Sequence, residues 1–470
     1  MTAARENAAF TSGSTMRHVV VMTATSSVGL VAIFFVDAIN LFYIALLGQQ
    51  ALAAAIGYAA TIMFFSISVC IGVSIATAAL VGRTLGAGDV NESRELATAS
   101  LVYLVAIATL FAAVLFPLLP FFLGLLGAQG ETLALSVRFM QIVVPSIPLL
   151  GLGMCLGALL RAKGDPRRAM FVTLAGGAAA LVLDPLLIFG FELGLTGAAI
   201  ATFCVRIVLV MVGLHGVWKV HNMLGPLSMR AVKIYLTPFF GIALPAIVTQ
   251  LATPVGNAYV TGVIAQFGDD AVAGWAIVGR IIPVAFGVIF ALSGAVGPIM
   301  SQNYGAALFD RVTSTLRDAL VFTLIYCIAV WALLALLNSP IISIFSASGD
   351  AALLVRIFCL FVAGSFLFNG ALFVANAAFN NLGFPLYATI FNWGRATLGV
   401  IPFVWVGKAY GPEGVLIGWG LGAIVFGTAA IAVAFTVMKK LPDRAAKEKR
   451  PNRQIPPAAN SPFTSGKGSS

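Results

Sequence analysis

Long apolar stretches separated by short polar turns repeat along almost the whole chain, from Val19 to Met438. Each stretch reaches the length of about 20 residues that an α-helix needs to cross the hydrocarbon core of a membrane. The period-two alternation that marks a strand of an outer-membrane barrel does not occur in them. The pattern therefore predicts an all-α membrane protein that crosses the bilayer many times.

Turn residues divide the apolar region into twelve predicted spans. Polar turns such as "GAGD", "KGDP" and "YGPEG" mark the boundaries, because glycine, proline and charged residues interrupt apolar helices. The predicted spans are 17–47, 51–81, 96–123, 132–160, 168–190, 196–219, 236–266, 271–301, 313–338, 351–381, 386–407 and 414–438.

The predicted spans form two groups of six, which we treat as two lobes. We expect a cytoplasmic segment at 1–16, an N-lobe at 17–219, a cytoplasmic linker at 220–235, a C-lobe at 236–438 and a basic disordered tail at 439–470. The end of the tail is rich in proline, serine and glycine, a composition typical of disorder.

The loops alternate between basic and acidic, which indicates the orientation of the chain. Only 9% of the residues are charged and 60% are hydrophobic, yet the net charge is +10. Because basic loops stay in the cytoplasm, both termini are predicted there, in a plasma (inner) membrane. A basic flank beside the last span sets topology and contacts anionic lipid, so we predict the bilayer rather than nucleic acid as a partner, and no obligate protein partner.

Cysteine and histidine patterns favour neither metal nor redox chemistry. The five cysteines lie singly in apolar spans without a CxxC pair, and the three histidines have no metal-ligand spacing. No HExxH, GxSxG or P-loop motif occurs either, so neither an enzyme nor a bound cofactor is predicted.

The second half of the chain repeats the first at a spacing of about 220 residues. For example, "LLRAKGDPRRAMF" (159–171) is similar to "AFNNLGFPLYATI" (378–390), and "GLTGAAIAT" (194–202) to "GPEGVLIGW" (411–419). Because each half has an even number of spans, the halves share one orientation and a pseudo-two-fold axis along the membrane normal. This architecture favours a transporter that works by rocking one lobe against the other, although a duplicated channel or structural protein remains open.

Four motifs in a fixed order carry a resemblance to a known family of transporters. They are "DAINLFYIALLGQQALAAAIG", "LVGRTLGAGD", "LLRAKGDPRRA" and "VLDPLLIFGFELGLTGAAIAT". With the repeat, they resemble the multidrug and toxic compound extrusion (MATE) family over nearly the whole chain. The resemblance implies twelve helices in two six-helix lobes. It also implies export of organic, often cationic, compounds in exchange for inward H⁺ or Na⁺.

Two carboxylates lie well inside predicted spans of the N-lobe, Asp37 in the first and Asp184 in the fifth. Such a residue costs at least about 2.5 kcal/mol on insertion scales, so it indicates a function. A rise of 1.5 Å per residue puts Asp37 about 15 Å, and Asp184 about 9 Å, from the outer ends of their spans. We predict that this pair binds the coupling H⁺ or Na⁺. A structural hydrogen bond, or pairing with Arg206 in the sixth span, is the alternative.

Residues around the pair refine this prediction. The resemblance implies that Thr202 supplies a hydroxyl near it. Pro185 follows Asp184 and has no backbone N–H to donate to the carbonyl oxygen of Leu181. Either this oxygen binds an ion or a water molecule, or the proline only produces a kink of the kind that membrane helices tolerate.

Several positions depart from the pattern of the family. Ala180 and Gly157 stand where it often has Asn, Phe139 stands where it often has Tyr, and the first predicted span has no proline to bend it. Because Na⁺ requires several oxygen ligands, these losses favour H⁺ as the coupling ion.

The C-lobe carries amides and arginines in place of deep carboxylates. Under the repeat, Asn257 takes the position of Asp37. Either the amides line a substrate cleft or they bridge helices. The residues predicted to line it are Asn40, Asn257, Gln250, Asn369 and Asn376. Arg280 and Arg395 lie inside spans, and if they face the cleft the substrate is an organic anion or another defined metabolite, such as a lipid-linked intermediate.

Overall fold

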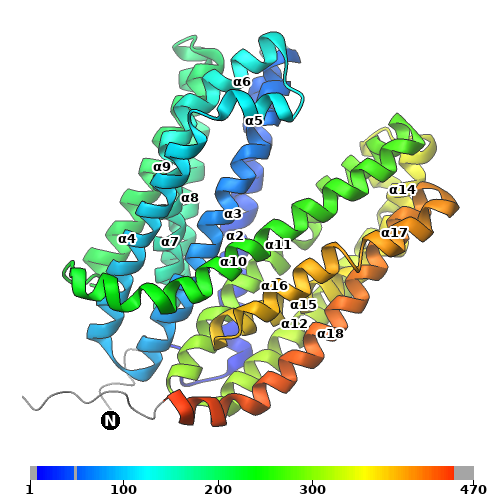
Figure 1. The fold of residues 1–470 in the computed structure, drawn as a ribbon. Helices are drawn as coiled ribbons and strands as arrows, with labels where there is room; N and C mark the ends of the chain where they lie inside the picture. The colour runs from blue at the N-terminus through cyan, green and yellow to red at the C-terminus, as the bar shows by residue number, and fades with distance from the viewer. Residues whose placement is uncertain (1–7, 47–49, 449–470) are drawn as a thin grey trace, which may run out of the picture.

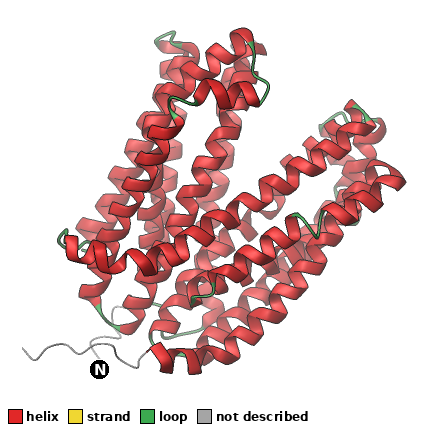
Figure 2. Ribbon diagram, viewed as in Figure 1, coloured by secondary structure: helices red, strands yellow, loops and turns green. Residues whose placement is uncertain are grey.

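A computed structural model of the chain describes residues 8–46 and 50–448, and within these ranges the backbone is helical with no strand (Figures 1 and 2). A few side chains inside these ranges, including that of Asp37, are outside the described set.

The first half of the chain forms one bundle, the N-lobe. Its helices are α2 (Thr15–Leu46), α3 (Gln50–Ala87), α4 (Val90–Leu115), α5 (Leu119–Leu125), α6 (Gly130–Val143), η1 (Val144–Ser146), α7 (Ile147–Lys163), α8 (Pro166–Pro185), η2 (Leu186–Gly190), α9 (Gly194–Leu214) and η3 (His215–Val220).

The second half forms the C-lobe. Its helices are α10 (Met229–Ile264), η4 (Ala265–Phe267), α11 (Asp269–Gly305), α12 (Phe309–Leu336), α13 (Asn338–Ile344), α14 (Gly349–Leu360), η5 (Val362–Ser365), α15 (Phe366–Leu382), α16 (Pro385–Ala396), α17 (Ile401–Gly407), η6 (Lys408–Tyr410) and α18 (Gly411–Glu448).

The two lobes repeat the same irregular features, which explains the sequence repeat in structural terms. In each lobe one predicted span is broken by a 3₁₀ turn, at Val144–Ser146 and again at Val362–Ser365. A seven-residue helix precedes each broken span, Leu119–Leu125 in one lobe and Asn338–Ile344 in the other. The fold is therefore a duplicated six-helix unit.

The number of membrane crossings agrees with the sequence pattern. The described residues contain 11 stretches long and apolar enough to span a membrane, and the last is Pro385–Arg444. This last stretch turns back at Gly411, whose positive φ of 86° suits glycine, so that α17 packs against α18. It therefore crosses twice, and the prediction of twelve transmembrane helices in two six-helix lobes is confirmed.

The lobes lie closest to each other at the end that carries the N-terminus and diverge toward the opposite end (Figure 1). We call these the inner and outer ends. At the inner end, α3 and α11 approach backbone to backbone. A Cβ atom at Gly86 would lie 2.0 Å from the carbonyl oxygen of Gln302, and one at Gly305 would lie 2.0 Å from that of Arg83. Glycine is thus required for this contact.

Arg83 strengthens the same contact from the N-lobe. Its Nε donates a 2.9 Å hydrogen bond to the carbonyl oxygen of Asn381, and its guanidinium lies 5.3 Å from the ring centroid of Tyr304. Both partners belong to the C-lobe, so the inner ends are joined by polar and aromatic contacts as well as by packing.

Two element boundaries differ from the sequence prediction. The predicted disordered tail is helical as far as Glu448, because Leu441 is fully buried and Arg444 donates a 2.8 Å hydrogen bond to the carbonyl oxygen of Gly383. Helix α10 begins at Met229, inside the predicted linker, because the side chain of Ser228 accepts a hydrogen bond from the backbone N–H of Ala231.

A charged cluster ties the turn before α8 to the end of the N-lobe. The Asp165 carboxylate accepts a 3.0 Å hydrogen bond from the backbone N–H of Arg168, forms a salt bridge with its guanidinium and lies 2.8 Å from Nε2 of His221. Partial burial alone would raise the pKa of Asp165, but the hydrogen bonds from Arg168 and His221 hold that pKa below its usual value.

We predict that Gly86→Ala destabilises the purified protein, because its Cβ would collide with backbone that cannot move aside. Overpacking of this kind costs about 1–3 kcal/mol. The melting temperature in detergent should fall, as measured by intrinsic fluorescence. Gly57→Ala on the same helix is the matched control, since no described atom lies within 4 Å of its Cβ position. Equal melting temperatures for the two variants would contradict the prediction.

We predict that Asp165 contributes stability above pH 4 that disappears in acid. Because its folded pKa is lowered, the contribution is complete above the unfolded value of about 3.9 and is lost as the pH falls through the folded value. Asp165→Asn keeps the helix cap but should flatten the fall in melting temperature between about pH 5 and pH 3. A pH dependence of the melting temperature equal to that of the wild type would contradict the prediction.

Candidate functional site

Helices α2 and α8 pack side by side and carry the two predicted carboxylate positions. A Cβ at Gly177 would lie 3.2 Å from Val36, and farther out the ring of Tyr43 lies 6.0 Å from that of Phe189. Between these contacts the chain places Asp37 and Asn40 on α2 and Asp184 on α8.

The two contacts therefore bracket all three positions at one level of the lobe. The side chain of Asp37 lies outside the described residues, so this residue is placed only by its position along α2. Asn40 is half-buried.

Asp184 is enclosed by protein and sits beside an irregular stretch of helix. Its exposed fraction is 3%, and α8 changes into a π-helix, Leu186–Gly190, directly after Pro185. Proline cannot donate the helical hydrogen bond, and π-helical turns often occur at functional sites. A buried carboxylate next to such a turn is an arrangement that can bind a proton or a small cation.

Arg206, the alternative partner of the carboxylates, contacts a different part of the lobe. Its guanidinium donates hydrogen bonds to the carbonyl oxygen of Val143 at 3.1 Å and to Oγ of Ser146 at 2.7 Å. These acceptors flank the break between α6 and α7. Arg206 therefore supports this break in the backbone.

Thr202 is half-buried on α9, and its hydroxyl donates a 2.9 Å hydrogen bond to the carbonyl oxygen of Ala198 in the same helix. This bond is the ordinary one for a threonine inside an apolar helix. The hydroxyl oxygen keeps its capacity to accept a second hydrogen bond.

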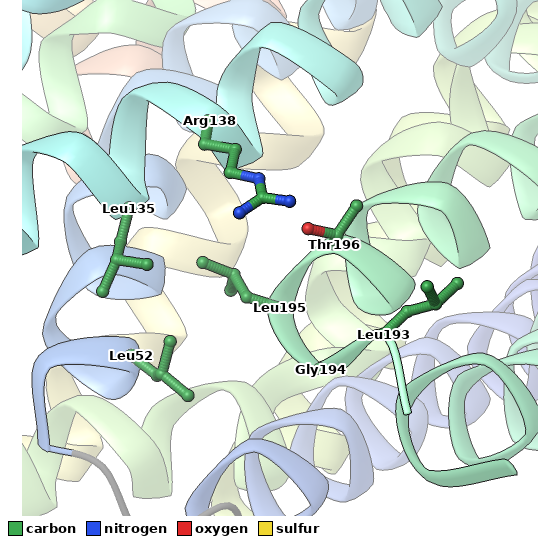
Figure 3. A pocket seen from close by; sticks show the side chains of 7 residues that line it. All are labelled: Leu52, Leu135, Arg138, Leu193, Gly194, Leu195 and Thr196. Carbon is green, nitrogen blue, oxygen red and sulfur yellow. The ribbon is translucent and has the colours of Figure 1, made fainter. Parts of the chain in front are cut away.

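A small cavity opens at the outer end of the N-lobe. Its volume is about 250 Å³, and four leucines, Gly194 and two polar side chains line it (Figure 3). These residues are Leu52, Leu135, Arg138, Leu193, Gly194, Leu195 and Thr196. The Arg138 and Thr196 side chains approach each other across the cavity in Figure 3.

This cavity lies outside an apolar barrier. Leu52 and Leu195 pack with Ile188 in one buried cluster, and Ile188 follows Asp184 by about one helical turn. The barrier therefore separates the cavity from the Asp184 region. Sequence reasoning missed Arg138, because nothing in the sequence of the helix 130–143 marks this arginine as part of a cavity.

The face of α3 that contacts the C-lobe is aromatic toward the outer end. A Cβ atom added at Gly72 would lie 2.4 Å from Ile247 of α10, so the side of α3 that carries Gly72 contacts the C-lobe. Phe65 is seven residues away, two helical turns farther out, and Phe64 is adjacent to it. Both rings are exposed, by 44% and 45%, because the lobes have already diverged at this level.

The facing side of α11 carries a cation. A Cβ at Gly287 would lie 3.7 Å from Phe34 of α2, so this side of α11 faces the N-lobe. Arg280 lies two turns farther out on the same side and is exposed, and so is Val284. We refer to these exposed surfaces of α3 and α11, containing Phe64, Phe65, Arg280 and Val284, as the interlobe faces.

The structure separates the predicted amides of the C-lobe into two groups. Asn257 is exposed and Gln250 is half-buried, both on α10, whose Ile247 contacts the N-lobe. Asn369 and Asn376 are only 4% and 7% exposed on α15, which the other helices of the C-lobe surround. Buried Arg395 donates a 2.9 Å hydrogen bond to Thr253 Oγ1 and so links α16 to α10.

Comparison with known proteins identifies the family. The MatE family model matches residues 25–186 and again residues 245–406, one match in each lobe. A protein of Shewanella oneidensis named FAD transporter is 29% identical over 88% of this chain and 93% of its own. The multidrug export protein MepA of Staphylococcus aureus is 24% identical over 86% of this chain and 90% of its own.

Solved structures agree with the fold. The bent form of the MATE transporter VcmN of Vibrio cholerae superposes with a TM-score of 0.86 at 24% identity, covering 94% of this chain and 99% of that one. A transporter of the MOP superfamily from Pyrococcus furiosus superposes with a TM-score of 0.86 at 18% identity, covering 93% of this chain and 99% of that one.

The double match to one family model covers most of the chain, and the relatives match it nearly from end to end. Both lobes of the duplicated fold are therefore accounted for by a single family of membrane transporters. This chain belongs to the MatE family and is a multi-pass MATE transporter of the multidrug and toxic compound exporters.

Proposed function

We propose that this transporter is a secondary antiporter that exports organic, often cationic, drug-like compounds in exchange for H⁺ or Na⁺, with H⁺ favoured. Asp37 and Asp184 bind the coupling ion, assisted by Thr202. The two lobes rock to give alternating access across the plasma (inner) membrane, with both termini in the cytoplasm. The observation that carries the proposal is the burial of Asp184 on α8 at the level of the α2 segment that includes Asp37.

The coupling step follows from the cost of a charge inside the membrane. A carboxylate at 3% exposure is stabilised when a proton or cation neutralises it. Binding of the ion therefore changes the relative free energy of conformations that bury the pair differently. An organic cation that needs the same negative charge, or the conformation that the charge stabilises, then leaves as the ion enters.

The interlobe faces support an organic substrate. Phe64 and Phe65 are large, exposed aromatic side chains on the surface of the N-lobe that faces the C-lobe. Aromatic rings bind flat hydrophobic compounds of many shapes and attract cations through their π-electrons. Their separation from the opposite lobe at the outer end supports release of substrate from that side.

We predict that expression of this chain lowers ethidium accumulation in efflux-deficient cells, and that Asp37→Asn and Asp184→Asn abolish the effect. The amide is nearly the same size but cannot take up a proton or neutralise a cation. A protonophore should abolish the wild-type effect as well, whereas Asp89→Asn should export normally. If either carboxylate variant is present in the membrane and exports ethidium like the wild type, the proposed role of that residue in ion coupling is wrong.

An organic anion is the second candidate substrate, as for a related exporter or flippase of a defined metabolite. Arg280 favours it, because this exposed guanidinium lies on an interlobe face whose other members are apolar. An anion with aromatic rings matches both the charge of Arg280 and the Phe64 and Phe65 rings. The relative named FAD transporter extends this idea to flavin dinucleotides.

We predict that, if the anion candidate is correct, expressing cells release FAD into the medium and Arg280→Gln lowers this release about tenfold, the effect of one lost charge-assisted contact. Arg280→Lys should retain part of the release, because it keeps the charge. Arg317→Gln, at an exposed arginine of α12, is the control. Release of FAD that does not depend on expression of the chain would eliminate this candidate.

A further inference from the structure

The segment that precedes α2, residues 8–14, is bound at the inner end of the C-lobe. Phe10 is only 3% exposed and belongs to the main buried cluster of this lobe. Its backbone N–H donates a 2.9 Å hydrogen bond to Oε1 of Gln302 on α11, and its carbonyl oxygen accepts a 3.2 Å bond from Nδ2 of Asn303. The segment therefore has a fixed position although it forms no helix until Thr15.

One guanidinium group donates hydrogen bonds to three backbone carbonyl oxygens of this segment. Arg311 of α12 donates from Nη2 to the carbonyl oxygens of Phe10 at 2.8 Å and Ser12 at 3.1 Å. It also donates from Nη1 to that of Gly13 at 2.8 Å. Three carbonyl groups thus converge on one cation, and charged donors form stronger hydrogen bonds than neutral ones.

The same segment contacts the N-lobe. A Cβ at Gly164, in the turn between α7 and α8, would lie 2.4 Å from Cβ of Ala9 and 3.5 Å from the Phe10 ring. Gln302, which holds the backbone of Phe10, also donates from Nε2 a 2.6 Å hydrogen bond to the carbonyl oxygen of Ala162 on α7. Residues 8–14 are therefore held between α11 and α12 of one lobe and the α7–α8 turn of the other.

We propose that residues 8–14 form a latch that keeps the inner ends of the two lobes closed, with Arg311 and Gln302 as the residues that hold it. Opening of the inner end moves the α7–α8 turn away from α11, so it breaks the bond from Gln302 to Ala162. It also removes the surface against which Ala9 and Phe10 pack. Release of the latch is then a step of the transport cycle, and this role rests on the alternating access of the proposed function.

Substitutions that weaken the contacts of residues 8–14 should shift the equilibrium from the conformation with the inner end closed to the one with the inner end open. Arg311→Ala removes the donor of three bonds to the segment, and Gln302→Ala removes the side chain that bonds to the segment and to α7 together. Both act on the closed inner end and leave the interlobe faces unchanged. Each should raise the population that is open at the inner end.

The experiment measures the separation of the inner ends with spin labels at Arg167→Cys on α8 and Lys440→Cys on α18, both exposed. Of the native cysteines, four are buried and Cys204, which is half-buried, is replaced by alanine. Pulsed electron–electron resonance on the full chain in nanodiscs then gives the distance distribution. Arg317→Ala, on the same helix as Arg311, is the matched control.

Both Arg311→Ala and Gln302→Ala should raise the population at longer distance about tenfold over the control, the change expected for loss of about 1.4 kcal/mol. Distributions that match the control in both variants, with the melting temperature showing folded protein, would overturn the latch. The readout does not require transport. A failure of ethidium or FAD export would count against the proposed function and leave the distances to decide on the latch.

Discussion

The close approach of α3 and α11 at the inner end is the contact on which the arrangement of the lobes depends. In a membrane, apolar side chains gain little by leaving lipid for protein, so helices associate mainly through tight packing and polar contacts. Gly86 and Gly305 provide the packing, and Arg83 adds the polar contacts across the same boundary. The lobes are joined at this end and diverge elsewhere, and Phe64, Phe65 and Arg280 are exposed on the surfaces that face the opposite lobe.

Irregular backbone occurs at separate places in the N-lobe, including one beside Asp184 and one at the break between α6 and α7. The π-helix after Pro185 and the 3₁₀ turn at Val144–Ser146 both interrupt spans that could have been continuous helices. Arg206 donates hydrogen bonds at the second break, so the backbone and hydroxyl groups there do not remain unsatisfied inside the membrane. Such departures from regular structure are concentrated where a protein has to bind something.

Asp184 in the N-lobe and Arg280 in the C-lobe differ in charge and in placement, and this difference bears on substrate selection. The N-lobe has Asp184 enclosed among its helices, whereas the C-lobe presents Arg280 on its interlobe face. A charge within one lobe acts on an ion that enters that lobe. A charge on an interlobe face acts on the transported compound itself. For an anionic substrate, the coupling ion and the substrate would therefore be recognised by separate groups. A cationic substrate would instead compete with the ion for the carboxylates, or for the conformation they stabilise, and would pass beside the Arg280 guanidinium.

The sequence by itself determined the class of fold, the twelve crossings and the duplication, because apolar length and turn residues are local properties that a bilayer enforces on every span. It also singled out Asp37 and Asp184, since a carboxylate in an apolar run is conspicuous. Only the tertiary structure decided what each isolated polar residue contacts. Arg206 binds the α6–α7 break, Arg395 binds Thr253, and Arg280 is left on an interlobe face. The tertiary structure also revealed that residues 8–14 are held between the two lobes. The sequence could not show this, because the partners Gln302 and Arg311 lie about 300 residues away in the chain.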